Sequence, residues 1–424
     1  MPAIARHLAL TLLALTALLT SVALPRAAEL VLRRGVNIEA WQTWTNRATF
    51  LSPGYDRTNY PDWQKRVDAG RLAELRAQGF DFVRLNVDPS PMFWVTPDEV
   101  TPLLDRVVAA TRRLQAAGFV VIVDLHLMPD MVDRPDGLHE VLGTGGRDAV
   151  SFDRYVALVG RVAARLAPLP RDKTALELVN EPDQDWFSRV AITDRWPAQL
   201  TALHRAARKA APELTLVLSG SRSSLIPGLL RLDPTPWAGD PDVLWTFHYY
   251  EPMAVTHAGQ PWEESAARFL THLPYPAESI DDATAEARLS AARRAIEATI
   301  ADPGRRRELT AAVVKAMATY RASRAGPASI AADFAQVADW ARTNRIPPSR
   351  ILLGEFGVFQ EGADPAARAT VLRATREAAE AAGFAWAVYT IGFSGPRRSF
   401  GILDGPTSAR LEPAVASALG FAPR

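Results

Sequence analysis

The alternation of two kinds of segment is the feature of this sequence that most restricts its fold. Short runs of β-branched and apolar residues alternate with longer segments in which apolar residues recur at helical spacing. This alternation is expected where parallel strands are joined by crossover helices. The predicted strands are Leu32–Ile38, Phe82–Val87, Val120–Leu125, Thr174–Val179, Thr215–Leu218, Val243–Tyr249, Arg350–Gly354 and Phe384–Tyr389.

A Gly-Phe pair stands before three of these strands, at Gly79-Phe80, Gly118-Phe119 and Gly383-Phe384. A glycine that ends a helix, followed by an apolar residue that begins a strand, produces this pattern. Its recurrence indicates similar βα units, and 424 residues suit one such barrel with insertions. We therefore predict an α/β fold, a (β/α)8 TIM barrel that forms a single domain over residues 29–424.

The interval between the sixth and seventh predicted strands is too long for one crossover helix. Ile330, Phe334, Val337 and Trp340 recur at helical spacing and predict the ordinary packing helix before the seventh strand. The remaining stretch, about residues 281–323, is rich in Ala, Arg and Glu and predicts an extra pair of helices. We expect its apolar positions to be packing faces, so the pair is treated as an insertion in the same domain.

Composition and charge exclude several classes of protein. Lys and Arg (48) almost balance Asp and Glu (47), so no overall field favours nucleic acid or an anionic membrane surface. The sequence contains no cysteine, which excludes disulfides, thiolate metal sites and cysteine nucleophiles. A neutral substrate suits this charge balance.

The N-terminus predicts export. Arg6 and His7 precede the apolar run Leu8–Leu19, and small residues continue to Ala28, which is typical of a secretory signal. We expect residues 1–28 to be a signal peptide, cleaved after residue 23 or 28, and the mature protein to be periplasmic or extracellular. The run is shorter than the ~20 residues of a spanning helix, so no stable membrane association is expected after cleavage; an uncleaved anchor is the alternative.

Polar residues recur where the predicted strands end, which is where (β/α)8 enzymes place their catalytic groups. Arg84 lies inside an apolar strand and needs a carboxylate partner, either structural or catalytic. His126 is either a core histidine or a substrate contact; with no His-x-His or His-Glu-x-x-His pattern, we expect no metal and no cofactor. The other residues at these positions are Asn180, Glu181, His248, Tyr250, Glu355 and Trp386.

Two glutamates follow buried strands. Glu181 lies in Asn180-Glu181-Pro182, where proline ends the strand ladder, and Glu355 lies in Gly354-Glu355-Phe356-Gly357. Each motif is weak alone, because Asn-Glu-Pro can be an ordinary turn. At the same edge of one barrel, the two supply what glycosidic cleavage requires: an acid for the leaving oxygen and a carboxylate for the anomeric carbon.

These motifs, in this order, resemble glycoside hydrolase family 5, the cellulase family of the large retaining clan. Barrels of that clan have an acid/base and a nucleophile after strands four and seven, and the resemblance extends over nearly all of the predicted mature chain. The matched motifs are Gly35-Val36-Asn37, Val83-Arg84-Leu85, Asp124-Leu125-His126, Asn180-Glu181-Pro182, His248-Tyr249-Tyr250 and Gly354-Glu355-Phe356-Gly357.

The resemblance implies a role for each matched residue. Glu181 would be the acid/base, and Glu355 would be the nucleophile that forms a glycosyl-enzyme intermediate. Asn180 would bind the sugar 2-hydroxyl. Arg84 and Tyr250 would orient Glu355.

The cleavage subsite would be lined by His126 and His248, with Trp386 at its base. If these roles hold, the pKa of Glu181 should be raised to around 6, and the two carboxyl groups should lie about 5 to 5.5 Å apart. The third strand has one histidine where some members have two, and the eighth ends at Tyr389 rather than a second tryptophan. Part of the list of sugar contacts is therefore left open.

Tryptophans in the predicted loops indicate a sugar cleft, although about half of them are expected to cap the barrel instead. Their loop positions favour a polysaccharide or oligosaccharide over a small metabolite. The candidates for outer subsites are Trp41, Trp44, Trp94, Trp186 and Trp262.

The resemblance thus implies a retaining β-glycoside hydrolase that cleaves a β-linked glucan or a related polysaccharide or oligosaccharide, in the manner of an endoglucanase. Two alternatives stay open. A carbohydrate-binding barrel without catalysis would have no need for both glutamates and their supporting residues. A transglycosylase would use the same two glutamates, and the sequence does not separate it from a hydrolase.

Overall fold

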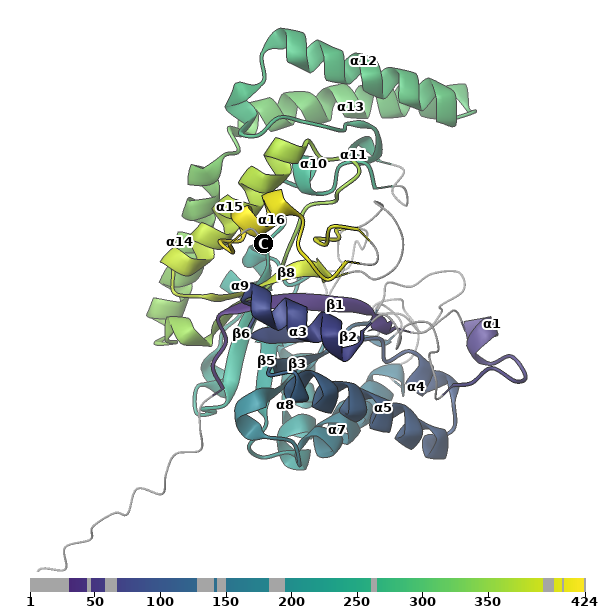
Figure 1. The fold of residues 1–424 in the computed structure, drawn as a ribbon, viewed down its shortest axis with the longest axis vertical. Helices are drawn as coiled ribbons and strands as arrows, with labels where there is room; N and C mark the ends of the chain where they lie inside the picture. The colour runs from purple at the N-terminus through teal and green to yellow at the C-terminus, as the bar shows by residue number, and fades with distance from the viewer. Residues whose placement is uncertain are drawn as a thin grey trace, which may run out of the picture.

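Eight parallel strands close into a barrel in the order in which they occur in the chain. The computed structural model describes residues 30–43, 47–57, 67–127, 141–142, 150–182, 195–260, 265–391, 400–405 and 408–422. Because β1 pairs with β8, the ring is complete and the predicted TIM barrel is confirmed (Figure 1). The strands are β1 (Arg34–Gln42), β2 (Phe82–Val87), β3 (Val120–Leu125), β4 (Thr174–Glu177), β5 (Thr215–Ser219), β6 (Val243–His248), β7 (Ile351–Phe356) and β8 (Ala385–Ile391).

Helices surround the strands (Figure 1). The longer crossover helices are α3 (Ala69–Gln78), α5 (Pro97–Ala116), α7 (Val150–Leu166), α8 (Trp196–Ala210), α14 (Pro327–Thr343) and α15 (Pro365–Ala381). The short helices are α1 (Arg47–Phe50), α4 (Pro91–Trp94), α9 (Ile226–Leu230), α10 (Met253–Thr256), α11 (Ala266–Phe269) and α16 (Pro413–Ala418). Within the described part of the chain, no helix combines the length and apolar character needed to cross a membrane.

The three glycines that the sequence places before strands do adopt the backbone of a helix end. Gly79, Gly118 and Gly383 have φ angles of 119°, 92° and 75°, in the region that residues with side chains rarely adopt. Gly79 also donates its N–H to the carbonyl of Arg76 at 3.1 Å and so closes α3. The local signal therefore predicted these helix ends correctly.

Two further helices, α12 (Asp282–Thr299) and α13 (Pro303–Ser323), pack against each other beside the barrel, at the top of Figure 1. Each begins after an aspartate whose side chain accepts a backbone N–H, Asp281 from Thr284 and Asp302 from Arg305. The pair lies in the chain between β6 and β7. It is a helical insertion that leaves the closed ring of strands unaltered.

Inside the barrel, an apolar layer of side chains lies nearer the N-terminal ends of the strands, and a polar layer lies nearer their C-terminal ends. Side chains two positions apart on a strand face the same side, so Arg84 follows Phe82 and Asp124 follows Ile122 on the inner face. The apolar layer consists of Phe82, Ile122, Ala175, Val217, Leu244, Leu352, Ala385 and Ala387. The buried polar residues that come next toward the C-terminal ends of the strands are Asn37, Arg84, Asp124 and Glu177.

Candidate active site

Glu181 and Glu355 meet at the C-terminal end of the barrel. Glu355 lies in β7, and Glu181 comes four positions after the last residue of β4. One carboxylate oxygen of each and a ring nitrogen of His248 all lie within 4.8 Å of one another. His248 Nδ1 is 2.8 Å from Oε1 of Glu181 and 3.6 Å from Oε2 of Glu355. The structure therefore brings together the two glutamates that the sequence singled out.

The Glu355 carboxylate has a donor on each oxygen. Arg84 Nη1 donates to Oε1 at 2.6 Å, and the hydroxyl of Tyr250 donates to Oε2 at 2.8 Å. The side chain is only 5% exposed. A guanidinium and a phenol hydroxyl in this arrangement fix the orientation of the carboxylate and stabilise its negative charge. The prediction that Arg84 and Tyr250 orient Glu355 agrees with these contacts.

Glu181 has a different environment. Its side chain is 22% exposed, and burial of the carboxyl raises its pKa to about 7 against the opposing charges of His126 and Arg84. The residue has a φ of 42°, which is uncommon for a residue with a side chain. Such backbone conformations cluster at functional sites. The direction of the pKa shift matches the expectation for an acid/base.

Arg84 is fully buried. It lies at the centre of a group of polar side chains, the Arg84 cluster, that also contains Asn37, Asp124, Glu177, Asn180 and Glu355. Its Nε and Nη2 donate to the two oxygens of Glu177 at 2.7 and 2.8 Å. Burial works against the positive charge, but Asp124, Glu177 and Glu355 outweigh it and hold the pKa of Arg84 well above its usual value. Nη1 and Nη2 make the remaining contacts, with Asn37 Oδ1 (2.9 Å), Asn180 Oδ1 (2.8 Å) and Asp124 Oδ2 (3.1 Å).

The two histidines of the site differ in charge. Burial lowers the pKa of His248 to about 4, so the ring is neutral at pH 7. Burial also acts against a charge on His126, but Asp124, with Oδ2 2.7 Å from His126 Nδ1, outweighs it and raises the pKa of His126 to about 9. Neutral His248 thus bridges toward both glutamates, while His126 adds a positive charge and is 13% exposed.

Glu181, His248 and Glu355 are close enough to share a metal ion. However, both oxygens of Glu355 already accept hydrogen bonds, and the charge of Arg84 beside them opposes a second cation. The group is better described as an acid/base cluster. Its arrangement suits proton transfer at Glu181 and nucleophilic attack by Glu355.

A family model described as "Cellulase (glycosyl hydrolase family 5)" matches residues 43–395. The chain belongs to this family. The matched range includes β2 to β8 and both glutamates. The family resemblance that the sequence motifs indicated is therefore confirmed.

Two curated relatives of this family 5 chain are similar over about half of its length. Endoglucanase 3 of Fibrobacter succinogenes is 24% identical over 225 residues, which are 53% of this chain and 30% of the relative. Cellodextrinase A of Ruminococcus flavefaciens is 23% identical over 232 residues, 54% of this chain and 61% of the relative. This chain thus spans less than two thirds of the length of either relative.

Solved structures share the barrel over nearly the whole chain. The cellulose synthase subunit Z of Clostridioides difficile has a TM-score of 0.61 at 19% identity, covering 92% of this chain and 99% of that one. Thermotoga maritima Cel5A in complex with cellobiose has a TM-score of 0.60 at 18% identity, with 92% and 97% covered. A family 5 xyloglucanase from Paenibacillus pabuli has a TM-score of 0.62 at 14% identity, with 92% and 98% covered. These identities establish a common fold.

Trp386 does not join the cluster. The inner positions of β8 are Ala385 and Ala387, so Trp386 between them points outward, where it is fully buried. Its ring packs edge-on against Phe356, and its Nε1 donates to Oε1 of Glu380 at 3.3 Å. The prediction that Trp386 forms the base of the cleavage subsite is wrong, because the phase of the alternation along β8 places it on the outer face.

The tryptophans predicted for outer subsites divide into two groups. Trp41 and Trp94 are only 2% and 8% exposed, and Trp94 packs edge-on against Phe50 with 5.6 Å between ring centres. Neither presents a ring face to a sugar, so the subsite prediction is wrong for these two. Trp44, Trp186 and Trp262 lie outside the described residues.

Several members of the cluster were missed as site residues. Glu177 binds Arg84 through both oxygens, and burial raises the pKa of its carboxyl to about 7 despite that partner. For Asn86 and Asp124 the available signal was a charged or amide residue inside an apolar strand, two positions from Arg84 and from His126 respectively. The missed residues are Asn37, Glu39, Asn86, Asp124, Glu177 and Tyr389.

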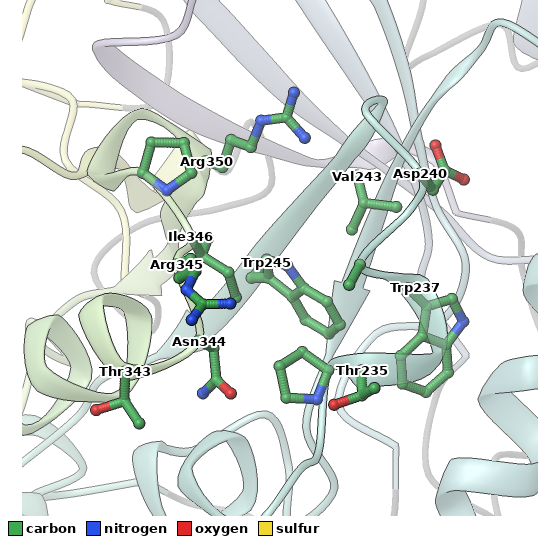
Figure 2. A pocket seen from close by; sticks show the side chains of 13 residues that line it. Thr235, Trp237, Asp240, Val243, Trp245, Thr343, Asn344, Arg345, Ile346 and Arg350 are labelled. Atoms are coloured by element: carbon green, nitrogen blue, oxygen red, sulfur yellow. The ribbon is translucent and has the colours of Figure 1, made fainter.

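A separate pocket of about 520 Å³ lies at the other end of the barrel (Figure 2). Its lining includes Val243, the first residue of β6, and Arg350, which directly precedes β7. Asp240, also in the lining, is held by His204 and Arg208. Among the described residues, the pocket shares no member with the Arg84 cluster, and this end of a (β/α)8 barrel serves stability.

Proposed function

We propose that the chain is a retaining β-glycoside hydrolase in which Glu181 is the acid/base and Glu355 is the nucleophile. The observation that carries the proposal is the unequal setting of two adjacent carboxyl groups. Glu355 accepts hydrogen bonds from Arg84 and Tyr250, whereas burial raises the pKa of Glu181 to about 7. Such a difference assigns attack to one group and proton donation to the other.

In the first step, a Glu355 oxygen forms a bond to the anomeric carbon while the bond from that carbon to the glycosidic oxygen breaks. Glu181 gives its proton to the departing oxygen, which leaves as a sugar hydroxyl. The raised pKa of Glu181 keeps this proton available near neutral pH. His248, 2.8 Å from Oε1 of Glu181, orients the carboxyl toward the reacting bond.

In the second step, the Glu181 carboxylate takes a proton from water, and the water oxygen bonds to the anomeric carbon as the bond to Glu355 breaks. Two displacements at one carbon retain the anomeric configuration. Retaining enzymes hold their carboxyl groups about 5 to 5.5 Å apart, and inverting enzymes about 6.5 to 9.5 Å apart. The approach of the two carboxylates to within 4.8 Å supports the retaining class.

Asn180 is proposed to bind the 2-hydroxyl of the sugar under attack. Its Oδ1 already accepts from Arg84 Nη2 at 2.8 Å, which turns the amide nitrogen toward the site. Nδ2 is a donor, and the oxygen of a hydroxyl accepts from it. This contact would strengthen as charge develops on the ring in the transition state.

The substrate class is inferred from the family and from the charge of the chain. The curated relatives are named as an endoglucanase and a cellodextrinase, and Lys and Arg (48) almost balance Asp and Glu (47) in this chain. We propose a neutral β-linked glucan or a related oligosaccharide, cleaved as by an endoglucanase. A non-catalytic sugar-binding role is disfavoured, because a binder would not need an acid with a raised pKa.

We also propose that the protein is exported. Residues 1–28, which lie outside the described residues, have the basic start, apolar run and small residues of a signal peptide. Mature protein from the periplasm or the medium should begin at residue 24 or 29. N-terminal sequencing of the processed protein tests this.

The experiment for the proposed function is an assay of purified protein on a panel of β-glucans, β-mannans and bacterial exopolysaccharides. Reducing-end release measures hydrolysis, and NMR of the first product measures its anomeric configuration. We expect a β product from at least one β-linked polymer, and sugar transfer to an added acceptor only as a minor product. An α product would contradict the retaining mechanism, and no turnover of any member would contradict the enzymatic role.

A further inference from the structure

Glu39 is a carboxyl group of the site that the proposed mechanism does not use. It lies on β1 two positions beyond Asn37, whose amide nitrogen donates to the carbonyl of Gly354 at 2.9 Å inside the barrel. The pairing of β1 with both neighbouring strands shifts register near Ile38, so the placement of Glu39 follows from its contacts. Its carboxyl accepts a hydrogen bond from Tyr389 and lies within electrostatic reach of His126 and Glu355, on the inner side of the barrel near its mouth. It therefore stands above the layer that contains Arg84.

Tyr389 reaches the same layer from the neighbouring strand. It lies on β8 two positions beyond Ala387, an inward-facing residue of the apolar layer. Its hydroxyl donates to Oε2 of Glu39 at 2.5 Å. β1 and β8 are paired, so this hydrogen bond joins adjacent strands at the mouth of the barrel.

The Glu39 and Tyr389 pair lies within the electrostatic reach of the reacting groups. Burial raises the pKa of Glu39, while the hydrogen bond from Tyr389 and the charge of His126 act in the opposite direction. Burial also raises the pKa of Tyr389 far above its usual value, with further contributions from Glu39 and Glu355. The pair is thus part of the active-site cluster and not a remote surface contact.

Solvent exposure distinguishes the side chains that can touch a substrate from those that can only hold other side chains in place. Arg84, Asp124 and Glu177 are fully buried, so they act through other side chains. Glu39 and Tyr389 keep partial exposure, as do Glu181 and His126. A sugar entering the barrel mouth can therefore reach the Glu39 carboxyl directly.

The hydrogen bonding of Glu39 is incomplete compared with that of the other carboxyl groups. Glu177 receives two hydrogen bonds from Arg84, and Glu355 receives one on each oxygen. Among the residues that the structure describes, Tyr389 is the one hydrogen-bond donor to Glu39, and it uses Oε2. Oε1 belongs to a side chain that keeps partial exposure, so it is open to a hydroxyl donor on a bound sugar.

We propose that Glu39 is a specificity-determining residue that accepts a hydrogen bond from a hydroxyl group of the sugar unit bound at the cleavage point, with Tyr389 as its positioning residue. This inference rests on the proposed function. It narrows the substrate class to chains in which the hydroxyl facing Glu39 is unsubstituted. A branch, acyl group or methyl group on that hydroxyl would remove the donor and add bulk beside the carboxyl.

The test is a set of kinetic measurements that combines each enzyme variant with substrates that each lack one hydroxyl group. The substrates are 2,4-dinitrophenyl β-cellobioside and its analogues with the 2-, 3- or 6-hydroxyl of the ring next to the leaving group replaced by hydrogen. The variants are Glu39→Ala, Glu39→Gln and Tyr389→Phe. Measuring kcat/KM for every combination reveals which hydroxyl and which side chain act together.

We expect Glu39→Ala to lower kcat/KM for the parent substrate by about 10- to 100-fold, the range for a hydrogen bond to a charged group. For wild-type enzyme, kcat/KM on the 3- or the 6-deoxy analogue should be lower than on the parent substrate by a similar factor. For Glu39→Ala, kcat/KM on that same analogue should be little lower than on the parent substrate. Tyr389→Phe should give a smaller loss, mostly in KM, with the same coupling. The 2-deoxy analogue is the internal control, because its loss should be equal in wild type and Glu39→Ala.

Equal losses in all variants on every deoxy analogue would overturn the inference, because they would assign Glu39 a structural role without sugar contact. Unchanged kcat/KM in Glu39→Ala would overturn it as well. Glu39→Gln, which keeps an acceptor for Tyr389, should melt within about a degree of wild type and so separates a folding defect from lost contact. If wild-type enzyme turns over neither the parent substrate nor any β-linked polymer, the proposed function fails, and this inference fails with it.

Discussion

Arg84 Nη1 lies 2.6 Å from Oε1 of Glu355, although 271 positions separate the two residues in the chain. The same guanidinium binds both oxygens of Glu177, so one side chain on β2 joins β4 and β7 in the interior of the barrel. The orientation of Glu355 and the satisfaction of a buried charge thus depend on a single residue. Stability and catalysis should respond together when it is changed.

Replacing Arg84 by methionine should destabilise the protein by about 3 to 5 kcal/mol, the cost of removing one partner from a buried ion pair. Activity should also fall, by up to the factor lost in a Glu355 variant, because Glu355 loses its anchor. Thermal unfolding and kcat/KM measure the two effects. Arg342→Met is the matched control: Arg342 is 75% exposed in a surface pair with Asp339, a type worth up to about 1 kcal/mol. Similar melting temperatures for the two variants would refute the central role of Arg84.

The pH dependence of activity should report the protonation of Glu181. Because its pKa is raised to about 7, the acid form needed for proton donation is abundant below pH 7 and is lost as the pH rises above it. On a poor leaving group such as a sugar, kcat should therefore decline on the alkaline side with a midpoint near 7. The 2,4-dinitrophenolate leaving group needs no proton, so the decline should weaken or vanish for the first step. An alkaline midpoint that is unchanged in Glu181→Gln would assign the titration to another group.

Gly354 should not tolerate a side chain. A Cβ at this position would lie 2.5 Å from Oγ1 of Thr246 and 3.2 Å from Nε2 of His248, so His248 and the adjoining Glu355 would have to shift. We expect Gly354→Ala to cost about 1 to 3 kcal/mol of stability and to reduce kcat/KM by at least about tenfold, since displacements near 1 Å cost catalysis heavily. Gly239→Ala is the control, because nothing lies within 4 Å of the added carbon. Equal activity of the two variants would contradict the account of this close approach.

Trp386 provides a test of the corrected assignment. The ring is buried between β8 and the outer helices, with Phe356 and Glu380 as partners. Trp386→Phe should therefore lower the melting temperature while leaving KM and kcat within about twofold of wild type. Trp386→Ala should cost about 3 to 5 kcal/mol. A large rise in KM for Trp386→Phe, with unchanged stability, would return the residue to the sugar site.

The barrel could be predicted because its signals are local. Helix ends at Gly79, Gly118 and Gly383 are set by the backbone freedom of glycine, and the strands are short apolar runs. The order of the strand ends then places Glu181 and Glu355 at one edge. These two positions follow from topology alone, which is why the pair could be predicted without knowledge of side-chain contacts.

The wrong role of Trp386 and the omission of Tyr389 arise from the phase of side-chain alternation along β8, which the sequence does not give. Trp386 is the second residue of β8 and Tyr389 lies three positions further along, and only the closed barrel shows that Trp386 faces outward while Tyr389 reaches Glu39. Glu177 was missed because a charged residue in an apolar strand has no evident partner until Arg84, 93 positions away, is brought beside it. Contacts between distant strands are not encoded in local spacing.

In the proposed mechanism, Glu355 forms a covalent bond to the sugar while Glu181 transfers the proton. 2,4-Dinitrophenyl 2-deoxy-2-fluoro-β-cellobioside tests it most directly, because fluorine slows both steps and the good leaving group restores the first, so the intermediate accumulates. Mass spectrometry of the digested protein should find one fluorocellobiosyl group on the peptide that contains Glu355, and none on the Glu355→Gln variant. A label on Glu181 or Glu39, or turnover of ordinary substrate without any covalent label, would contradict the account.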